Sequence, residues 1–162
     1  GTRCGDMDPA IILHIMSREE LTLHEANTLM NKHSGVAGIS GVSSDMREVI
    51  QASNDGNPTA KLALEAYCYR IKKYIGAYAA AMNGLDCVVF TGGVGENSVN
   101  VRRITCDNMD FLGIKLDLAL NEKTRATETD ISAADAGSRA LVIPTNEELV
   151  IARDTKRLIE GN

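Results

Sequence analysis

Residues 86–98 read DCVVFTGGVGENS, a short apolar run that passes directly into a glycine-rich segment. The run 86–91 predicts a short, fully buried strand of the kind found inside a mixed or parallel sheet. A helix is expected to begin near Asn97 or Ser98 and to continue to about Met109. Strand, glycine-rich turn and helix together deliver backbone N–H groups and a helix N-terminus to an anion, usually a phosphate.

The glycine-rich segment TGGVGENS leaves two interpretations open. A ligand can approach the backbone closely only where no Cβ intervenes, and such turns often need a positive φ, so glycines favour a phosphate site. The segment is neither a Walker A loop, because GK[ST] is missing, nor a complete GxGxxG, because a serine follows Glu96 and Asn97. A tight structural turn is the alternative.

Further strands are expected downstream of this segment. They are predicted around residues 113–116, 130–132 and 140–143. A final helix follows, with a capping box between Thr145 and Glu148 and with Leu149, Ala152 and Ile159 facing inward.

Upstream, the pattern is mainly helical. Helices are predicted from Pro9, from Glu19 or Glu20 to Lys32, over 46–52 and over 59–83, whereas the Ser/Gly-rich stretch 34–45 favours irregular backbone. Helices thus alternate with a few strands. The sequence predicts an α/β fold with a small mixed sheet flanked by helices.

Composition restricts the possible classes of protein. The chain has 162 residues, 44% of them apolar and 24% charged, which is typical of one globular domain and excludes a disordered tail. The net charge is −5 and no run of Lys or Arg exceeds two, which argues against a nucleic-acid partner. The longest uncharged apolar stretch, 75–85, has about half the length that a membrane helix needs, so no membrane partner is expected.

Cysteine usage and the start of the chain bear on compartment and completeness. Cys4, Cys68, Cys87 and Cys106 form no CxxC pair, which predicts reduced thiols and a cytoplasmic location, with two disulfides as the alternative. Cys68 and Cys87 lie in segments expected to be core. The chain opens with Gly1 and without an initiator methionine, so we expect a piece of a longer protein.

Three other segments carry candidate functional residues, each with a structural alternative. Asp45 can be an N-cap beside a solvated Arg47. Arg3 lies between glycines, where its fork of donors suits phosphoryl oxygens, although a surface arginine is the commoner case. Glu147 and Glu148 open a helix, where carboxylates favour the helix dipole, and one of them could equally bind Mg²⁺ without leaving a spacing signature.

Taken in order, four segments resemble the acetate kinase family closely. They are GTRCGDMDPAI at 1–11, SGVAGISGVSSDMREV at 34–49, FTGGVGENS at 90–98 with VRR at 101–103, and IPTNEELVIARDT at 143–155. The resemblance implies the fold of the sugar kinase, heat-shock chaperone and actin (ribonuclease H-like) superfamily. It also implies that residues 1–162 form a C-terminal nucleotide-binding and dimerisation domain, with the N-terminal, acyl-binding domain absent.

The resemblance assigns roles to residues at matching positions. Arg3 matches the catalytic arginine that contacts the phosphoryl group in transfer, and Glu147 matches the ligand of Mg²⁺ or Mn²⁺. The nucleotide-binding residues would be Asp45, Met46, Arg47, Gly93, Val94, Gly95, Glu96 and Asn97.

The implied reaction is ATP plus acetate giving ADP plus acetyl phosphate, catalysed by a homodimer. The 162-residue chain alone is expected to be inactive or nearly so, because the acyl side of the site is missing. Two alternatives stay open. One is a propionate kinase of the same family, and the other is a nucleotide-binding or dimerising module that functions by itself.

Overall fold

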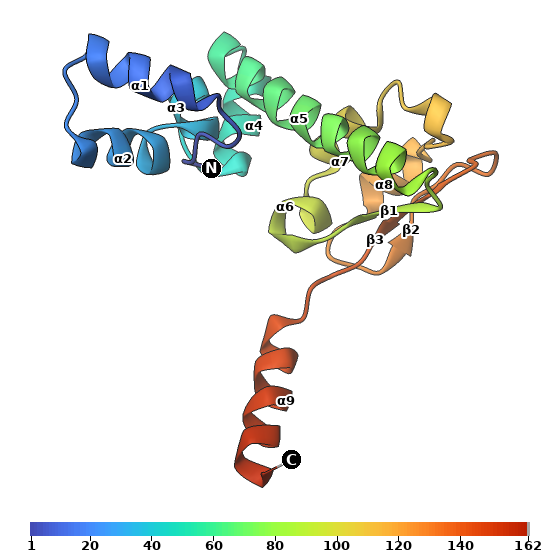
Figure 1. The fold of residues 1–162 in the computed structure, drawn as a ribbon. Coiled ribbons are helices and arrows are strands. Elements are labelled where there is room, and N and C mark those ends of the chain that lie inside the picture. Colours follow the sequence, from blue (N-terminus) through green and yellow to red (C-terminus); the bar gives the residue numbers. More distant parts are fainter. Residues whose placement is uncertain (162) are drawn as a thin grey trace. The chain divides into compact units, whose positions relative to one another are not determined.

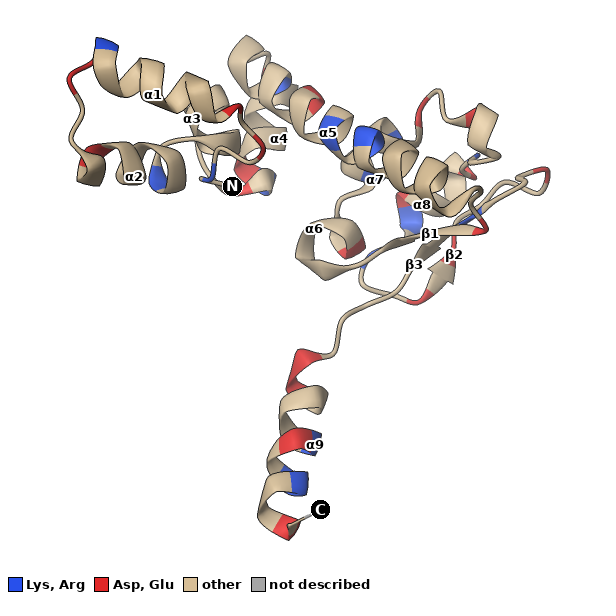
Figure 2. Cartoon of the chain, in the orientation of Figure 1, with Lys and Arg blue, Asp and Glu red and all other residues tan. Residues whose placement is uncertain are grey.

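The computed structural model describes residues 1–161 and divides the chain into two compact units, residues 1–74 and the residues from Ile75 onward (Figure 1). Helix α5 (Pro58–Met82) contributes residues to both units. Acidic and basic residues are interspersed along the elements of each unit (Figure 2). No helix within residues 1–161 combines the length and hydrophobicity that a bilayer crossing requires.

The first unit is helical. It contains α1 (Pro9–Arg18), α2 (Leu23–Lys32), α3 (Gly35–Ser40), α4 (Met46–Asn54) and the first part of α5. Its buried apolar residues are Ala26, Val36, Met46, Val49, Ala60, Ala63, Leu64 and Cys68. Asp8 caps α1 and accepts a hydrogen bond from the backbone N–H of Ala10, as the sequence predicts.

Helix α2 begins later than the expected Glu19 or Glu20. Glu20 has a φ of +54°, which a helix cannot include. The helix starts after Thr22, where Thr22 and Glu25 form a reciprocal capping box. Local capping chemistry therefore decides the boundary.

The stretch 34–45 is not wholly irregular, because α3 forms within it. The reason is a contact distant in sequence: the N–H of Ala37, in the first turn of α3, donates to the carbonyl of Gly1 at 2.9 Å. Gly41, with a φ of +64°, ends the helix. Ser34 and residues 41–45 remain non-helical.

The second unit is built on a three-stranded mixed sheet with the order β1-β3-β2. β1 (Cys87–Phe90) pairs in parallel with β3 (Arg139–Val142), and β2 (Thr129–Asp130) pairs antiparallel with β3. Helices α6 (Gly92–Asn97), α7 (Val99–Cys106) and α8 (Leu118–Lys123) belong to the same unit. The expected α/β fold with a small mixed sheet and flanking helices is confirmed.

Two strand predictions need correction. β1 is not fully buried: Phe90 is buried, but Cys87 and Val89 are exposed, because β1 is an edge strand with one face uncovered by described residues. Residues 113–116 form no strand. They make only two isolated bridges, Ile114 with Ser138 and Leu116 with Ser132, one parallel and one antiparallel.

The core of the second unit lies against the sheet. It consists of Phe90, Cys106, Met109, Ile114, Ile131, Ala140 and Val142. The 3₁₀ turn η1 (Asp110–Leu112) follows α7. Within residues 1–161 none of the four cysteines forms a disulfide, which agrees with the predicted thiols rather than with the alternative of two disulfides.

The last helix, α9 (Glu147–Glu160), differs from its prediction in two ways. Asn146 caps it, accepting from the N–H of Leu149 at 3.0 Å, because Thr145 donates elsewhere and forms no capping box. The residues expected to face inward are exposed, Leu149 by 41% and Ile159 by 80%. No described residue covers the apolar face of α9.

Two buried threonines in this unit provide a matched stability test. The hydroxyl of Thr105 has no hydrogen-bond partner within residues 1–161, whereas that of Thr124 donates to the carbonyl of Leu120 at 2.8 Å. We expect Thr105→Val to keep or raise the free energy of unfolding, because it removes an unsatisfied buried polar atom. Thr124→Val should lower it by about 1 kcal/mol. Urea unfolding measures the free energy of unfolding of both variants. An equal decrease in Thr105→Val and Thr124→Val would contradict the claim that the Thr105 hydroxyl lacks a hydrogen bond.

Candidate functional site

Arg3 is carried by an extended segment whose backbone is fixed in the first unit. The N–H of Cys4 donates to Met30 at 2.8 Å, and the carbonyl of Thr2 accepts from Ser34 at 3.0 Å. A Cβ on Gly35 would come within 2.7 Å of the carbonyl oxygen of Arg3, so only glycine fits there. The Arg3 side chain is exposed, and within residues 1–161 its guanidinium makes no hydrogen bond or ion pair.

The loop after Arg3 is held by α5. The guanidinium of Arg70 lies over Gly5, where an added Cβ would be 3.2 Å from Nη2, and it pairs with Asp6. The hydroxyl of Tyr74 also donates to Asp6, which raises the pKa of Tyr74. No local sequence pattern indicates this contact, since Asp6 and Tyr74 lie 68 positions apart.

Asp45, Met46 and Arg47 open α4. The Asp45 carboxylate accepts from the Arg47 N–H at 2.9 Å and from its guanidinium, with Nη2 to Oδ2 at 2.5 Å. The hydrogen bond from the Arg47 side chain lowers the pKa of Asp45 to about 2. Met46 is buried, and the Arg47 side chain is 90% exposed. The structural alternative, an N-cap beside a solvated arginine, is thus present.

The first unit brings the Arg3 and Asp45 segments together. A Cβ on Gly1 would lie 2.9 Å from the carbonyl oxygen of Ser44, the residue before Asp45. An exposed guanidinium and the N-terminus of α4 therefore lie in neighbouring segments.

The glycine-rich segment forms a helix earlier than expected. α6 begins at Gly92, directly after β1, and α7 begins at Val99 after Ser98, whose hydroxyl accepts from Val101 at 3.3 Å. The φ of Gly92, +69°, makes the immediate change of direction possible. The predicted helix start near Asn97 or Ser98 is confirmed by α7, which Ser98 caps, whereas the predicted glycine-rich turn is wrong, because residues 92–97 form helix α6.

The glycines of α6 have different surroundings. A Cβ on Gly95 would lie 3.1 Å from the backbone of Phe90, so Gly95 permits close packing on β1. A Cβ on Gly93 would meet nothing within 4 Å. The same holds for Gly92, but Gly92 is half-buried whereas Gly93 is exposed, so Gly93 is the position where a ligand could best approach the backbone.

The other α6 residues are not equally available to a ligand. The Glu96 carboxylate is buried, and its Oε1 accepts from the N–H of Thr145 at 2.7 Å and from its hydroxyl at 2.8 Å. These hydrogen bonds lower the pKa of Glu96. Asn97 is exposed and donates to the carbonyl of Gly93 at 3.0 Å, and Val94 is half-buried.

Glu147 lies close in sequence to this contact, two residues after Thr145. Its carboxylate is exposed and has no hydrogen bond or ion pair among the described residues. The N–H of Ile143 donates to Phe90 at 3.0 Å, which continues the pairing of β1 and β3. α6 and the Glu147 segment thus follow the carboxyl ends of neighbouring parallel strands, the usual place for ligands in α/β sheets.

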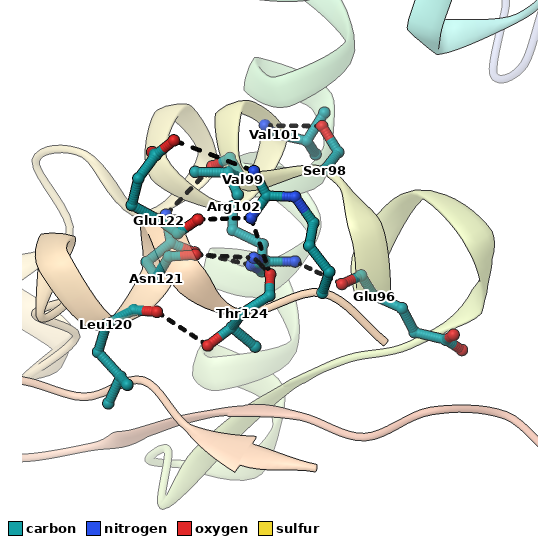
Figure 3. Close-up of polar contacts among 10 residues, drawn as sticks. Glu96, Ser98, Val99, Val101, Arg102, Leu120, Asn121, Glu122 and Thr124 are labelled. Carbon is teal, nitrogen blue, oxygen red and sulfur yellow. Dashed lines mark hydrogen bonds and ion pairs between the residues drawn. The ribbon is translucent and has the colours of Figure 1, made fainter. Parts of the chain in front are cut away.

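Sequence reasoning missed Arg102, which is fully buried in α7 (Figure 3). Its guanidinium donates five hydrogen bonds, all to neutral oxygens. The acceptors are the carbonyls of Gly95, Glu96, Asn121 and Thr124 and the side-chain oxygen of Asn121, at 2.7–3.2 Å. Burial lowers the pKa of Arg102. The VRR motif contains two arginines, and nothing in it indicates which is buried.

This network generates a second stability prediction. Arg102→Met should lower the free energy of unfolding by at least about 3 kcal/mol, because each buried acceptor left without a donor costs about 1–3 kcal/mol. Arg103→Met is the matched control, since Arg103 is the exposed neighbour in the same helix. Equal unfolding midpoints for the two variants would show that the network does not hold the unit together.

Comparison with known proteins places these features in a family. A model described as the acetokinase family matches residues 1–153. The acetate kinase of Halothermothrix orenii is 54% identical over 161 residues, covering 99% of this chain and 40% of that protein. The acetate kinase of Methanosarcina thermophila is 53% identical over 160 residues, covering 99% of this chain and 39% of that protein.

Solved structures agree with this assignment. An acetate kinase from Porphyromonas gingivalis matches with a TM-score of 0.91 and 49% identity, covering 98% of this chain and 40% of that one. A propionate kinase from Francisella tularensis matches with a TM-score of 0.85 and 39% identity, covering 93% and 38%. The chain spans about 40% of the length of the curated relatives it matches. Its sequence and fold make it a member of the acetokinase family.

Proposed function

We propose that residues 1–162 act as the C-terminal nucleotide-binding and dimerisation domain of a cytoplasmic, homodimeric acetate kinase. The reaction is ATP plus acetate giving ADP plus acetyl phosphate, in either direction. The observation that carries the proposal is the open backbone at Gly93, which follows a parallel strand and neighbours the Glu147 segment. The relatives named acetate kinase support the choice of reaction.

The proposed roles follow from donor chemistry. The backbone at Gly93 and the exposed Asn97 amide would contact the nucleotide, together with the α4 residues Asp45 and Arg47. Arg3 would place its guanidinium against the phosphoryl group in transfer, where a preorganised positive charge stabilises the developing negative charge. No protein nucleophile is required, because in-line phosphoryl transfer depends mainly on positioning and charge neutralisation.

The donor set fits a divalent cation bound largely through phosphates. Residues 1–161 contain no group of three His, Cys, Asp or Glu side chains that could hold a metal by themselves. Mg²⁺ usually takes one or two protein carboxylates and keeps waters, so the unpaired carboxylate of Glu147 suffices, and Mn²⁺ suits the same oxygens. The cation would neutralise phosphate charge during transfer.

The likeness to a propionate kinase keeps that acid as a second candidate substrate. The ratio of kcat/KM for acetate and propionate, measured on the full-length protein, decides between them. A coupled assay of ADP release tests the reaction itself, and no acid-dependent turnover with either substrate would refute the proposal.

Arg3→Ala in the full-length protein should lower kcat about 100- to 1000-fold, because losing one preorganised contact to the transition state costs about 2.7–4 kcal/mol. The KM for ADP should change much less. Arg18→Ala, at the exposed end of α1, is the control and should retain wild-type kcat. A loss of less than threefold for Arg3→Ala would remove Arg3 from the catalytic role.

Gly93→Val should weaken ADP binding without loss of fold, because a Cβ at this position meets no atom within 4 Å beyond its own helix turn, and the larger side chain fills the space proposed for the nucleotide. Gly93→Ala should have a smaller effect in the same direction. Calorimetric titration with Mg-ADP measures the affinities, and thermal unfolding checks the fold. An unchanged affinity of Gly93→Val for Mg-ADP would show that the glycine-rich segment has a purely structural role.

A further inference from the structure

We infer that Glu96 acts as a positioning residue: through Thr145 it fixes the start of α9, and with it Glu147, to the glycine helix α6. The inference rests on the proposed function, because it concerns the same site. It also revises the role that family resemblance assigns to Glu96, which is direct contact with the nucleotide.

The first support is the burial of the Glu96 carboxylate and the hydrogen bonds that it already accepts. Glu96 is only 8% exposed, and Oε1 accepts both available hydrogen bonds from Thr145. The backbone N–H of Gly92, one turn earlier in α6, also interacts with the carboxylate and lowers its pKa. A carboxylate used in this way is not free for a ligand, and its charge would oppose an approaching phosphate.

The second support is the lack of any other anchor for α9. Within residues 1–161, no side-chain hydrogen bond or ion pair joins a residue of α9 to another element, since its ion pairs, Lys156 with Glu160 and Arg157 with Asp154, lie within the helix. Every residue of α9 is exposed. Past Ile143, the contact of Thr145 with Glu96 is therefore the polar link that determines where Glu147 lies relative to α6.

The third support is that both ends of the link are themselves fixed. The carbonyls of Gly95 and Glu96 accept from buried Arg102 at 2.8 and 2.9 Å, so α6 cannot easily rotate. On the other side, Asn146 caps α9 directly after Thr145, which leaves little freedom between Thr145 and Glu147. Side chains that orient metal ligands in this manner typically change metal affinity or activity about 10- to 100-fold when removed.

The test uses four variants of the full-length protein: Glu96→Met, Thr145→Val, the double variant and Thr145→Ser. We expect the Mg²⁺ concentration for half-maximal activity to rise about tenfold or more in Glu96→Met. It should rise in Thr145→Val as well, with the KM for acetate changed less than twofold. Thr145→Val removes the hydroxyl donor but keeps the backbone N–H, so its effect should be smaller than that of Glu96→Met. The double variant should be no worse than Glu96→Met, because that change already removes the acceptor shared by both hydrogen bonds. Thr145→Ser keeps both donors and should behave as wild type, as should the exposed control Glu128→Met.

A second readout does not depend on activity. Backbone amides in residues 143–149 should exchange hydrogen faster in Glu96→Met than in the wild type, since the Thr145 N–H loses its acceptor. If exchange is faster in Glu96→Met but the wild-type protein shows no acid-dependent turnover, the proposed function is refuted, while the hydrogen-bonded link between Glu96 and Thr145 is still supported.

Three results would overturn the inference. Unchanged exchange in Glu96→Met would show that the link is absent in solution. If the Glu96→Met and Thr145→Val effects multiplied in the double variant, Glu96 would act directly on the nucleotide. A variant that loses only thermal stability, with both readouts unchanged, would assign Glu96 a merely structural role.

Discussion

The buried guanidinium of Arg102 is the interaction on which the second unit depends. Removing a charge from water costs several kcal/mol, and here no carboxylate hydrogen-bonds to it. Five hydrogen bonds to neutral oxygens offset that cost, and arginine stays protonated because its intrinsic pKa is so high. The acceptors come from the end of α6 and from the end of α8 with the residue after it. These segments are therefore fixed together.

This constraint leaves α6 with little freedom except where a ligand would need access. Arg102 binds the carbonyls near its end, Gly95 packs on the backbone of Phe90, and Glu96 binds Thr145. Among the α6 glycines, Gly92 and Gly93 face open space, and Gly93 is the exposed one of the two. A rigid backbone with such an open stretch reduces the ordering that ligand binding must impose.

The sequence predicts the fold well where local signals decide and less well where distant contacts decide. The apolar run of β1 and the Asp8-Pro9 start of α1 are local, and both are found. Helix α3 depends on the carbonyl of Gly1, more than thirty residues away. The many glycines and serines of 34–45 therefore led to a wrong prediction of irregular backbone. Thr145 has the residue type of a helix cap, but its hydroxyl donates to the distant carboxylate of Glu96 instead.

The same distinction applies to the candidate site. Family motifs identify segments and residue types, and the grouping of α6 with Glu147 follows from parallel strands. The motif GGVGEN does not say that Glu96 points inward while Gly93 lies open, because this depends on the packing of Thr145 and Phe90. The prediction that Leu149, Ala152 and Ile159 of α9 face inward is wrong for a related reason. An amphipathic pattern shows that a face is apolar, not which residues cover it.

The arginines illustrate how structure separates positioning from chemistry. Arg102 uses its donors inside the core, and Arg47 and Arg70 use theirs on Asp45 and Asp6. Arg18 likewise has no hydrogen bond or ion pair among the described residues, but it lies at the end of α1, outside the four segments that resemble the family. Arg3 combines a backbone held by hydrogen bonds on both sides with a guanidinium that no described residue engages. That combination is what a contact to a transferring phosphoryl group requires, since the charge must be in place beforehand and still be available.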